Sequence, residues 1–318
     1  MIAVLGAFDG IHRGHAVLLR RAASLSDDWG IVTFDPHPGV FLGTMDAVLF
    51  TAQESRTIRA ALGVPRTVLL RFDDAMARLS PSEFWAFLRS HAEIDGVVIG
   101  RDFRFGFGRT GDAALMEAFC RASALPCEVC DLVAGDEEEK ISSTAIRGCV
   151  SAGRCEDAAA LLGYPYFISA EVVHGDERGR SLGFPTANLN VRPGGLRPGG
   201  HDAKLLPAEG VYSAAAAVSS ECTGCTGWVA GALSVGRNPT FAGAEVRAEA
   251  FLLDFSGDLY GTTLTVFLLS RLRGQTRFDG PEALKRQIER DVGAARMDFA
   301  GKWPAEKAEA WRRALEKS

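Results

Sequence analysis

The sequence lacks the features that mark membrane, secreted and polyanion-binding proteins. No uninterrupted apolar run is long enough to span a bilayer, and Met1 leads directly into an apolar strand pattern without the basic and hydrophobic segments of a secretory leader. Lysine and arginine number 35 against 40 aspartates and glutamates, so the net charge is −5 and no basic excess suits a polyanion. We expect a cytoplasmic protein without a membrane or nucleic-acid partner, whose partners are small molecules. No feature of the sequence specifies an oligomeric state.

The seven cysteines do not form the even, regularly spaced set of a disulfide framework. An odd count over 318 residues indicates reduced thiols in a reducing compartment. Two pairs with CxxC spacing, Cys127 with Cys130 and Cys222 with Cys225, offer four zinc ligands in principle. Because the pairs fall in different predicted domains, we favour buried or loop thiols over a structural zinc.

The first half of the chain predicts an α/β domain. A length of 318 residues with 47% apolar side chains suits two globular domains. The boundary between them is expected at Tyr164-Pro165, because a residue before a proline disfavours helix and the helical pattern ends there. The domains are then residues 1–164 and 165–318. In the first, strand patterns alternate with helical spacing, which predicts a parallel sheet covered on both faces. The expected strands are residues 2–8, 30–34, 67–72 and 96–100, and the expected helices are residues 12–23 and 81–91.

The second half predicts an antiparallel barrel or sandwich. Short strand patterns follow one another with Gly, Pro and Asn between them and no helical spacing. Two helices are expected near the end of the chain, and the segment 192–200, which is rich in Gly and Pro, is expected to be a surface loop. The strands are residues 166–173, 210–218, 228–235, 248–255 and 263–269, and the helices are residues 281–295 and 304–315.

Residues 6–15 (GAFDGIHRGH) predict a phosphate-handling turn between a strand and a helix. Gly10 and Gly14 let the backbone approach a phosphate, and the helix that follows points its free N–H groups and positive dipole end at it. His12 and His15, three residues apart, fall on one face of the first helical turn. An isolated pair of histidines would more often be packed or exposed side chains, but the carboxyl end of a parallel strand is where α/β sheets bind ligands.

Three segments downstream complete this candidate site. His37, in residues 33–38 (TFDPHP), ends the next strand at the same edge of the sheet, although it also suits a plain turn. Residues 100–112 (GRDFRFGFGRTGD) interleave aromatic, Arg and Gly residues and either wall a pocket for a flat ring or form a loop held by Phe packing. Residues 141–147 (ISSTAIR) place Ser142, Ser143 and Thr144 at a helix cap with Arg147 one turn on, which suits a cap or a phosphate clamp.

A second candidate site lies in the barrel-like half. Residues 174–190 (HGDERGRSLGFPTANLN) end in Pro-Thr-Ala-Asn, so Thr186 and Asn188 face the same way on an extended segment and suit a Mg²⁺–phosphate site. The alternative for this tetrapeptide is a turn. Glu249, in residues 248–255 (AEAFLLDF), places a carboxylate on a mainly apolar strand face, where it suits a general base or a half-exposed strand glutamate.

These segments, in this order, resemble the bacterial bifunctional riboflavin kinase/FMN adenylyltransferase family, also called FAD synthetase. The second half adds GRSLGFPTAN, EGVYSA, SVGRNPTF, AEAFLLDF, SGDLYG and RFDGPEALKRQIERD, so the resemblance covers nearly the whole chain. It implies a Rossmann-like nucleotidyltransferase domain with a parallel sheet, followed by an antiparallel six-stranded riboflavin-kinase β-barrel with C-terminal helices. It also implies Mg²⁺ as cofactor, and ATP, riboflavin, FMN and FAD as substrates and products.

The resemblance implies roles for individual residues. His12 and His15 would steady the ATP phosphates in the transition state, Glu249 would activate the riboflavin 5′-hydroxyl, and Thr186 and Asn188 would hold Mg²⁺. Asp102, Phe105 and Arg109 would contact flavin. The implied nucleotide-binding residues are Gly6, Phe8, Asp9, Gly10, Ser143, Thr144, Arg147, Gly183 and Pro185. Two positions depart from the family pattern: Ala7 replaces a residue that is often small and polar, and Phe251 replaces a frequent His or Tyr.

Two other functions compete with this interpretation. A nucleotidyltransferase for another alcohol phosphate, such as a cytidylyltransferase, would explain the first site with an accessory β domain. A flavin-binding carrier or regulator with decayed catalytic groups would explain the overall pattern, although the retained His12, His15 and Glu249 argue against decay.

Overall fold

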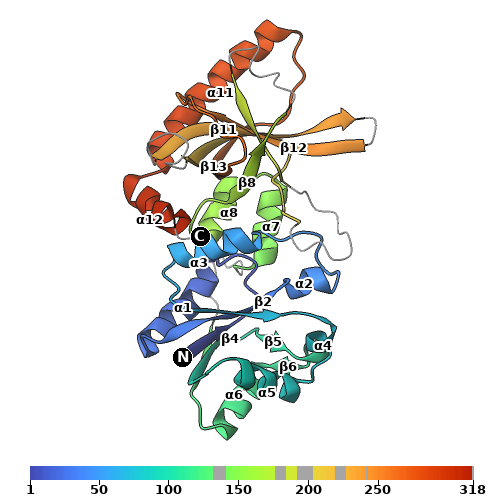
Figure 1. Ribbon diagram of the computed structural model, residues 1–318, viewed down its shortest axis with the longest axis vertical. Helices are drawn as coiled ribbons and strands as arrows, with labels where there is room; N and C mark the ends of the chain where they lie inside the picture. The colour runs from blue at the N-terminus through green and yellow to red at the C-terminus, as the bar shows by residue number, and fades with distance from the viewer. Residues whose placement is uncertain (132–140, 176–183, 192–202, 219–226, 241–242, 317–318) are drawn as a thin grey trace. The chain divides into compact units, whose positions relative to one another are not determined.

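The computed structural model describes residues 1–131, 141–175, 184–191, 203–218, 227–240 and 243–316 (Figure 1). The described chain divides into two compact units. The first holds residues 1–143 with residue 203, and the second holds residues 144–191 and the described residues from 204 onward. Among the helices of these residues, none combines the length and apolar character needed to cross a bilayer.

A five-stranded parallel sheet forms the centre of the first unit. The strand order is β3-β2-β1-β4-β7, so β2 and β3 lie on one side of β1, and β4 and β7 lie on its other side. In such a sheet, ligands bind at the carboxyl ends of the strands near the point where the order reverses. The strands are β1 Ile2–Leu5, β2 Trp29–Asp35, β3 Thr67–Arg71, β4 Gly96–Gly100 and β7 Cys127–Cys130.

Helices follow these strands, and capping residues fix where several of them begin. Thr51 and Glu54 form a reciprocal capping box at α3, and Ser80 and Glu83 form another at α5, which also has Pro81 in its first turn. The helices of this unit are α1 Arg13–Leu25, α2 Pro38–Phe41, α3 Ala52–Ala61, α4 Asp74–Ala77, α5 Pro81–His91 and α6 Ala113–Ala122.

The core of the first unit forms where side chains from the sheet meet those of α5 and α6. Val97 and Ile99 of β4 belong to the same buried cluster as Leu88 of α5 and Met116 of α6. Burial of such large apolar side chains stabilises the fold by about 1.5–3 kcal/mol each. The sheet is thereby held rigidly enough to position the loops at its carboxyl edge.

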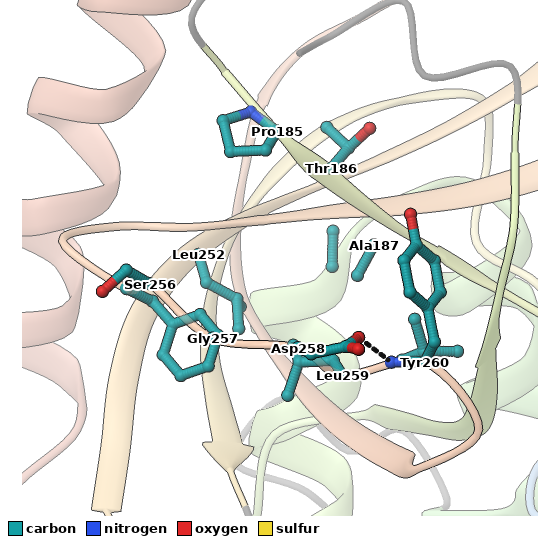
Figure 2. A pocket seen from close by; sticks show the side chains of 12 residues that line it. Pro185, Thr186, Ala187, Leu252, Ser256, Gly257, Asp258, Leu259 and Tyr260 are labelled. Carbon is teal, nitrogen blue, oxygen red and sulfur yellow. Dashed lines mark hydrogen bonds between the residues drawn. The ribbon is translucent and has the colours of Figure 1, made fainter. Parts of the chain in front are cut away.

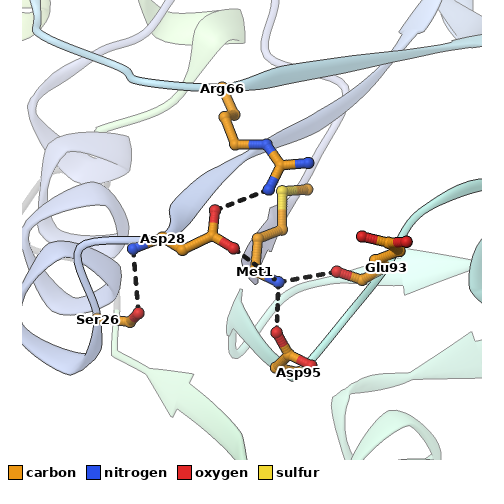
Figure 3. A network of polar contacts seen from close by, with 6 residues as sticks. All are labelled: Met1, Ser26, Asp28, Arg66, Glu93 and Asp95. Carbon is orange, nitrogen blue, oxygen red and sulfur yellow. Dashed lines mark hydrogen bonds and ion pairs between the residues drawn. The ribbon is translucent and has the colours of Figure 1, made fainter.

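An ionic network ties together the opposite, amino-terminal edge of this sheet (Figure 3). The Met1 ammonium lies 2.6 Å from Asp95 Oδ2 and 3.4 Å from Asp28 Oδ2, and it donates to Glu93 O. Arg66 donates to Asp28 Oδ1 at 2.7 Å, so Asp28 bridges the segments that lead into β1 and β3. These contacts lie away from the edge where ligands are expected.

The second unit is a closed antiparallel barrel of six strands, in the order β10-β11-β12-β9-β8-β13. The sequence left a barrel and a sandwich open, and the pairing of β8 with both β9 and β13 closes the sheet. The strands are β8 Phe167–Val173, β9 Thr186–Leu189, β10 Gly210–Val218, β11 Gly227–Thr240, β12 Gly243–Leu252 and β13 Thr263–Arg273.

Two C-terminal helices pack on the barrel, as the sequence predicted (Figure 1). They are α11 Pro281–Lys302, which extends seven residues beyond the predicted end at residue 295, and α12 Ala305–Leu315. Trp303 and Trp311 both contact the ring of Phe267, and Trp228 Nε1 donates to Ala308 O at 2.9 Å. Aromatic packing therefore holds both helices to the strands.

Two shorter helices, α7 Ser143–Ser151 and α8 Cys155–Leu162, belong largely to the second unit. Ala208 N–H donates to Val150 O at 3.3 Å, and the Arg271 guanidinium donates to Ala152 O at 3.3 Å. The domain boundary expected after residue 164 would assign both helices to the first domain, and it stays a prediction.

Candidate active sites

The turn between β1 and α1 has the backbone geometry that its glycines predict. Gly10 has a φ of +77°, which a residue with a side chain rarely adopts. A Cβ on Gly6 would lie 2.8 Å from the Phe8 ring, so only glycine leaves room for that ring. The first turn of α1 carries no acidic side chain, so no negative charge within that turn neutralises the positive end of the helix dipole.

His12 and His15 lie together on one face of this turn, as their spacing predicted. Their rings stack with centroids 3.6 Å apart and an angle of 14° between the planes. His12 is the N-cap of α1, and its Nδ1 accepts the His15 backbone N–H at 3.2 Å. His15 Nδ1 lies 3.1 Å from Gly10 O and donates to it, since a carbonyl only accepts. The Nε2 atoms are therefore the ring nitrogens left for a ligand.

Both histidines are neutral at pH 7. Burial lowers the pKa of His12 to about 4, and the carboxylate of Asp102 opposes this shift only in part. Burial, followed by repulsion from His12, also lowers the pKa of His15 well below its usual value. Asp102, in the segment after β4, is therefore close enough to His12 to act on its pKa by charge.

Three other predicted residues help to build the turn. The Asp9 carboxylate, 7% exposed, accepts the Leu49 N–H at 2.7 Å, and Ser143 Oγ donates to Asp9 O at 3.0 Å. His37 caps α2 by accepting the Gly39 N–H on Nδ1 at 3.1 Å. These contacts give Asp9, Ser143 and His37 structural roles, and the contacts of Asp9 and Ser143 with nucleotide stay predictions.

In the loop 100–112, Phe105 packs into the core, which is the second of the two alternatives that the sequence left open for this segment. Phe105 is buried in the core cluster and contacts Phe84, Phe103 and Phe119. The loop forms a small hairpin of β5 Arg104–Phe105 and β6 Gly111–Asp112, with the 3₁₀ turn Phe107–Arg109 between them. Asp102 and Arg109 are exposed, and Arg109 has a φ of +59°. A flavin contact by these three residues stays a prediction, and the buried position of Phe105 does not favour it.

Thr144 and Arg147 occupy the first two turns of α7, which begins at Ser143. Both belong to the second unit, whereas Ser143 belongs to the first. Their assignment to the triphosphate of ATP stays a prediction.

A cavity of about 110 Å³ lies beside the turn at the carboxyl ends of β1, β2 and β3. Phe8 and Asp9 line it from the turn, and His37 lines it from the start of α2. Arg56 and Arg59 line it from α3. Sequence reasoning missed these arginines, although their spacing of three residues on one helix predicts a common face.

In the barrel, strand register brings the three predicted kinase residues onto one face. Glu249 of β12 stands directly opposite Asn188 of β9, and Phe251 stands opposite Thr186. Side chains of directly opposed residues lie on the same face of a sheet. Thr186 Oγ1 donates to Glu249 Oε2 at 3.4 Å, so hydroxyl and carboxylate are in contact. The Pro-Thr-Ala-Asn segment is thus a strand, as predicted, and the turn alternative is wrong.

Asn188 is held closely against the backbone at Gly175. A Cβ built on Gly175 would lie 2.1 Å from Asn188 Nδ2 and 2.6 Å from Oδ1, distances that no real Cβ contact shows. Gly175 therefore permits the observed position of the Asn188 amide. Phe251, which replaces a His or Tyr that is frequent in the family, packs its ring against that of Phe184, with centroids 5.4 Å apart.

A larger cavity, of about 540 Å³, lies next to these residues (Figure 2). Pro185 and Thr186 stand at its border, while Ala187, Ala250 and Leu252 line it from the opposite strand face. Phe255, Leu259 and Tyr260 line it from the loop between β12 and β13. SGDLYG was only part of the family resemblance in the sequence, although Leu259 and Tyr260 within it, with Phe255 just before it, are side chains that suit a pocket for a flat ring.

Several residues that the sequence singled out lie outside the described residues or are free thiols. Gly183, Cys222 and Cys225 lie outside the described residues. Cys127 and Cys130 are free thiols. The hydrogen bond that Cys127 donates to Cys120 raises the pKa of Cys127, and burial raises the pKa of Cys130. Raised thiol pKa values disfavour metal binding. Across the described parts of the chain, no three His, Cys, Asp or Glu side chains gather as a metal-binding set.

Comparisons with known proteins identify both halves of the chain. Residues 1–145 match the family model for FAD synthetase, and residues 162–299 match that for riboflavin kinase. The bifunctional riboflavin kinase/FMN adenylyltransferase of Listeria monocytogenes is 32% identical over 94% of this chain and 92% of its own length. The protein of the same name from Escherichia coli K12 is 33% identical over 96% of this chain and 94% of its own length.

A solved structure supports the same likeness over the whole chain. It is named as a macrolide-efflux protein from Streptococcus pneumoniae, and that name describes the other protein. It is 30% identical, with a TM-score of 0.80, and the match covers 95% of this chain and 94% of that one. A match of both halves to flavin enzymes leaves no support for a cytidylyltransferase with an accessory β domain.

Proposed function

The chain belongs to the bifunctional riboflavin kinase/FMN adenylyltransferase family, and on that premise we propose which of its residues perform the two reactions. The enzyme phosphorylates riboflavin to FMN with ATP and then transfers AMP from a second ATP to FMN, which yields FAD and pyrophosphate. Phosphorylation occurs in the barrel at Thr186, Asn188 and Glu249. Adenylylation occurs at the β1–α1 turn with His12 and His15.

The contact between Thr186 and Glu249 carries the kinase assignment. The riboflavin 5′-oxygen attacks the γ-phosphorus of ATP, the bond from that phosphorus to the bridging oxygen breaks, and ADP leaves. Glu249 accepts the hydroxyl proton, and the hydrogen bond from Thr186 orients its carboxylate for this transfer. The apolar cavity beside Pro185 is the place for a flat ring of one of the two substrates.

The same residues fit Mg²⁺. The Thr186 hydroxyl donates a hydrogen bond to Glu249, so the lone pairs of its oxygen remain for a cation. The Asn188 amide adds a second neutral oxygen on the same face of the sheet. Magnesium prefers a few protein oxygens together with substrate phosphates. Thr186 and Asn188 would hold the ion, which when bound neutralises charge on the ATP phosphates.

The stacked histidines support the adenylyltransferase assignment. An FMN phosphate oxygen attacks the α-phosphorus of ATP while the bond to pyrophosphate breaks, so negative charge grows on the leaving group. Nε2 of His12 and of His15 face this charge, because both Nδ1 atoms are engaged within the turn. His12 Nε2 is a donor already, since its Nδ1 accepts the His15 N–H, and the charge of the triphosphate raises the pKa of His15 so that its Nε2 also becomes a donor when ATP is bound.

The location expected from the sequence is the cytoplasm. The five cysteines among the described residues are free thiols, which supports a reducing compartment. For the domains, we keep residues 1–164 as the adenylyltransferase and 165–318 as the kinase.

One assay tests both reactions together. The whole chain is incubated with riboflavin and MgATP, and the flavins are separated by chromatography over time. FMN should accumulate first and FAD should follow, with one pyrophosphate released for each FAD. If neither product forms, the proposed function is wrong.

A further inference from the structure

The cavity at the carboxyl ends of β1, β2 and β3 has a positively charged wall that the two reactions above do not use. Arg56 and Arg59, one turn apart on α3, both line it. Arg56 is exposed at the rim, and Arg59 is half-buried. A half-buried guanidinium needs an anion or several acceptors to replace its lost hydration.

Neither arginine has such a partner in the described parts of the chain, where no ion pair or hydrogen bond involves either side chain. Burial, and then the positive charge of Arg56, lower the pKa of Arg59. Other arginines of the unit are neutralised, as Arg66 is by Asp28 at 2.7 Å and Arg21 by Glu128 at 2.8 Å. Two carboxylates also line the cavity: Asp9, which accepts the Leu49 N–H, and the exposed Asp35. No ion pair joins either of them to Arg56 or Arg59 in the described parts of the chain. The pair on α3 therefore leaves positive charge available to a ligand.

Apolar and aromatic side chains form part of the remaining wall, beside the polar Thr33, His37 and Ser55. Phe34, Phe50 and Leu69 line it, and Leu69 is 50% exposed on the edge strand β3. When a ligand covers a large exposed apolar side chain, the removal of that surface from water stabilises the complex. The cavity therefore suits a ligand that combines a flat apolar ring with an anionic group.

We propose that Arg59, assisted by Arg56, binds the phosphate monoester of the flavin acceptor and selects FMN over riboflavin for adenylylation. This inference rests on the proposed adenylyltransferase function of the β1–α1 turn. Phe8 and Asp9 connect the two sites, because they belong to the turn and also line the cavity. A guanidinium fork binds two oxygens of a phosphate monoester and leaves the third to attack the α-phosphorus of ATP.

The test measures KM values for FAD formation from supplied FMN and MgATP. The variants are Arg59→Met, Arg59→Lys and Arg56→Met, and the matched control is Arg121→Met, an exposed arginine on α6. Arg59→Met should raise the KM for FMN by about tenfold to a hundredfold, the usual effect of losing a hydrogen bond to a charged group. The KM for ATP should stay within about twofold of the unmodified value, since the nucleotide binds elsewhere. Arg59→Lys should give a smaller rise, because it keeps the charge but not the fork.

Inorganic phosphate provides a second, independent readout. It should inhibit the unmodified enzyme competitively with FMN, and Arg59→Met should weaken that inhibition by a similar factor. Urea unfolding of each variant, compared with that of the unmodified chain, reports whether the first unit is folded, and the riboflavin kinase activity reports the same for the second unit. If Arg59→Met does not fold, Arg56→Met on the exposed rim repeats the test and should also raise the KM for FMN.

The outcomes separate this inference from the function on which it rests. If the unmodified chain makes no FAD from FMN, the adenylyltransferase assignment itself is wrong. If the chain makes FAD and the arginine variants leave the KM for FMN unchanged, only the arginine assignment is overturned. A rise in the KM for ATP alone would assign the arginines to the triphosphate and would also overturn the proposal.

Discussion

The imidazole rings of His12 and His15 stack face to face, with centroids 3.6 Å apart, at the start of α1. Two protonated rings at this distance would repel each other strongly, and burial further disfavours the charged forms. The free enzyme therefore holds two neutral imidazoles where the triphosphate of ATP is expected to bind. This arrangement leads to one prediction about activity and one about stability.

Changing His12 and His15 together to Ala should abolish FAD formation from FMN. Removal of a single donor to developing charge slows enzymes by about 10²–10³-fold, so the double variant should lose at least about a hundredfold in kcat. FMN formation from riboflavin should continue, because the kinase residues lie in the barrel. His91→Ala, at an exposed histidine of α5, is the matched control and should keep both activities. FAD formation by the double variant at the normal rate would refute the role of the pair.

The lowered pKa values predict that the free enzyme loses stability as the pH falls below 6.5. Between that value and about pH 4 the unfolded chain binds a proton at His12, and the folded chain does not. His15 acts in the same direction. The free energy of unfolding should fall by up to about 1.4 kcal/mol per pH unit for each histidine.

The measurement for this prediction is urea unfolding of the first unit at several pH values from 7.5 to 5, without ATP. The His12→Gln, His15→Gln double variant is the comparison, since glutamine does not titrate and the other groups contribute equally to both proteins. The slope with pH should be smaller in the variant. Equal slopes would show that the histidines titrate normally in the folded chain.

The contact between Gly175 and Asn188 predicts a selective loss of kinase activity. In Gly175→Ala the new methyl group would lie 2.1 Å from Asn188 Nδ2, so the amide must leave its place opposite Glu249. FMN formation should drop by about tenfold or more, as expected for a displaced catalytic-site group. FAD formation from supplied FMN should be unchanged.

The matched control for this variant is Gly293→Ala in α11. A Cβ there meets nothing within 4 Å, and alanine favours helix over glycine. This variant should keep both activities and be slightly more stable to heat. If Gly175→Ala also keeps full kinase activity, the position of Asn188 does not matter for the reaction.

The sequence predicted the elements of the fold whose signals are local. Strand β1, the glycine turn and helix α1 were found because apolar runs, a glycine with positive φ and helical spacing each act over a few residues. The two C-terminal helices were found for the same reason. The residues 127–130 of β7 carry no such signal, since CEVC is short and mixed in polarity, and this strand was missed.

The features that the sequence could not predict depend on contacts between distant segments. Closure of the barrel requires β9 to pair with both β8 and β12, and the register that sets Glu249 opposite Asn188 spans about sixty residues of chain. Arg56 and Arg59 resemble solvated surface charges until the strands that enclose them are placed. For Phe105 the sequence suggested a ligand contact, because it lies among Arg and Gly residues after a strand, whereas the structure buries it in the core.

The central claim is that the two reactions use separate sets of catalytic residues, and Glu249→Gln tests it most directly. The variant is incubated with MgATP and either riboflavin or FMN, and the products are separated by chromatography. Glutamine cannot accept the hydroxyl proton, so FMN formation from riboflavin should fall by about 10²–10⁴-fold. FAD formation from FMN should continue at the unmodified rate. Loss of both activities, or FMN formation at the unmodified rate, would contradict the account.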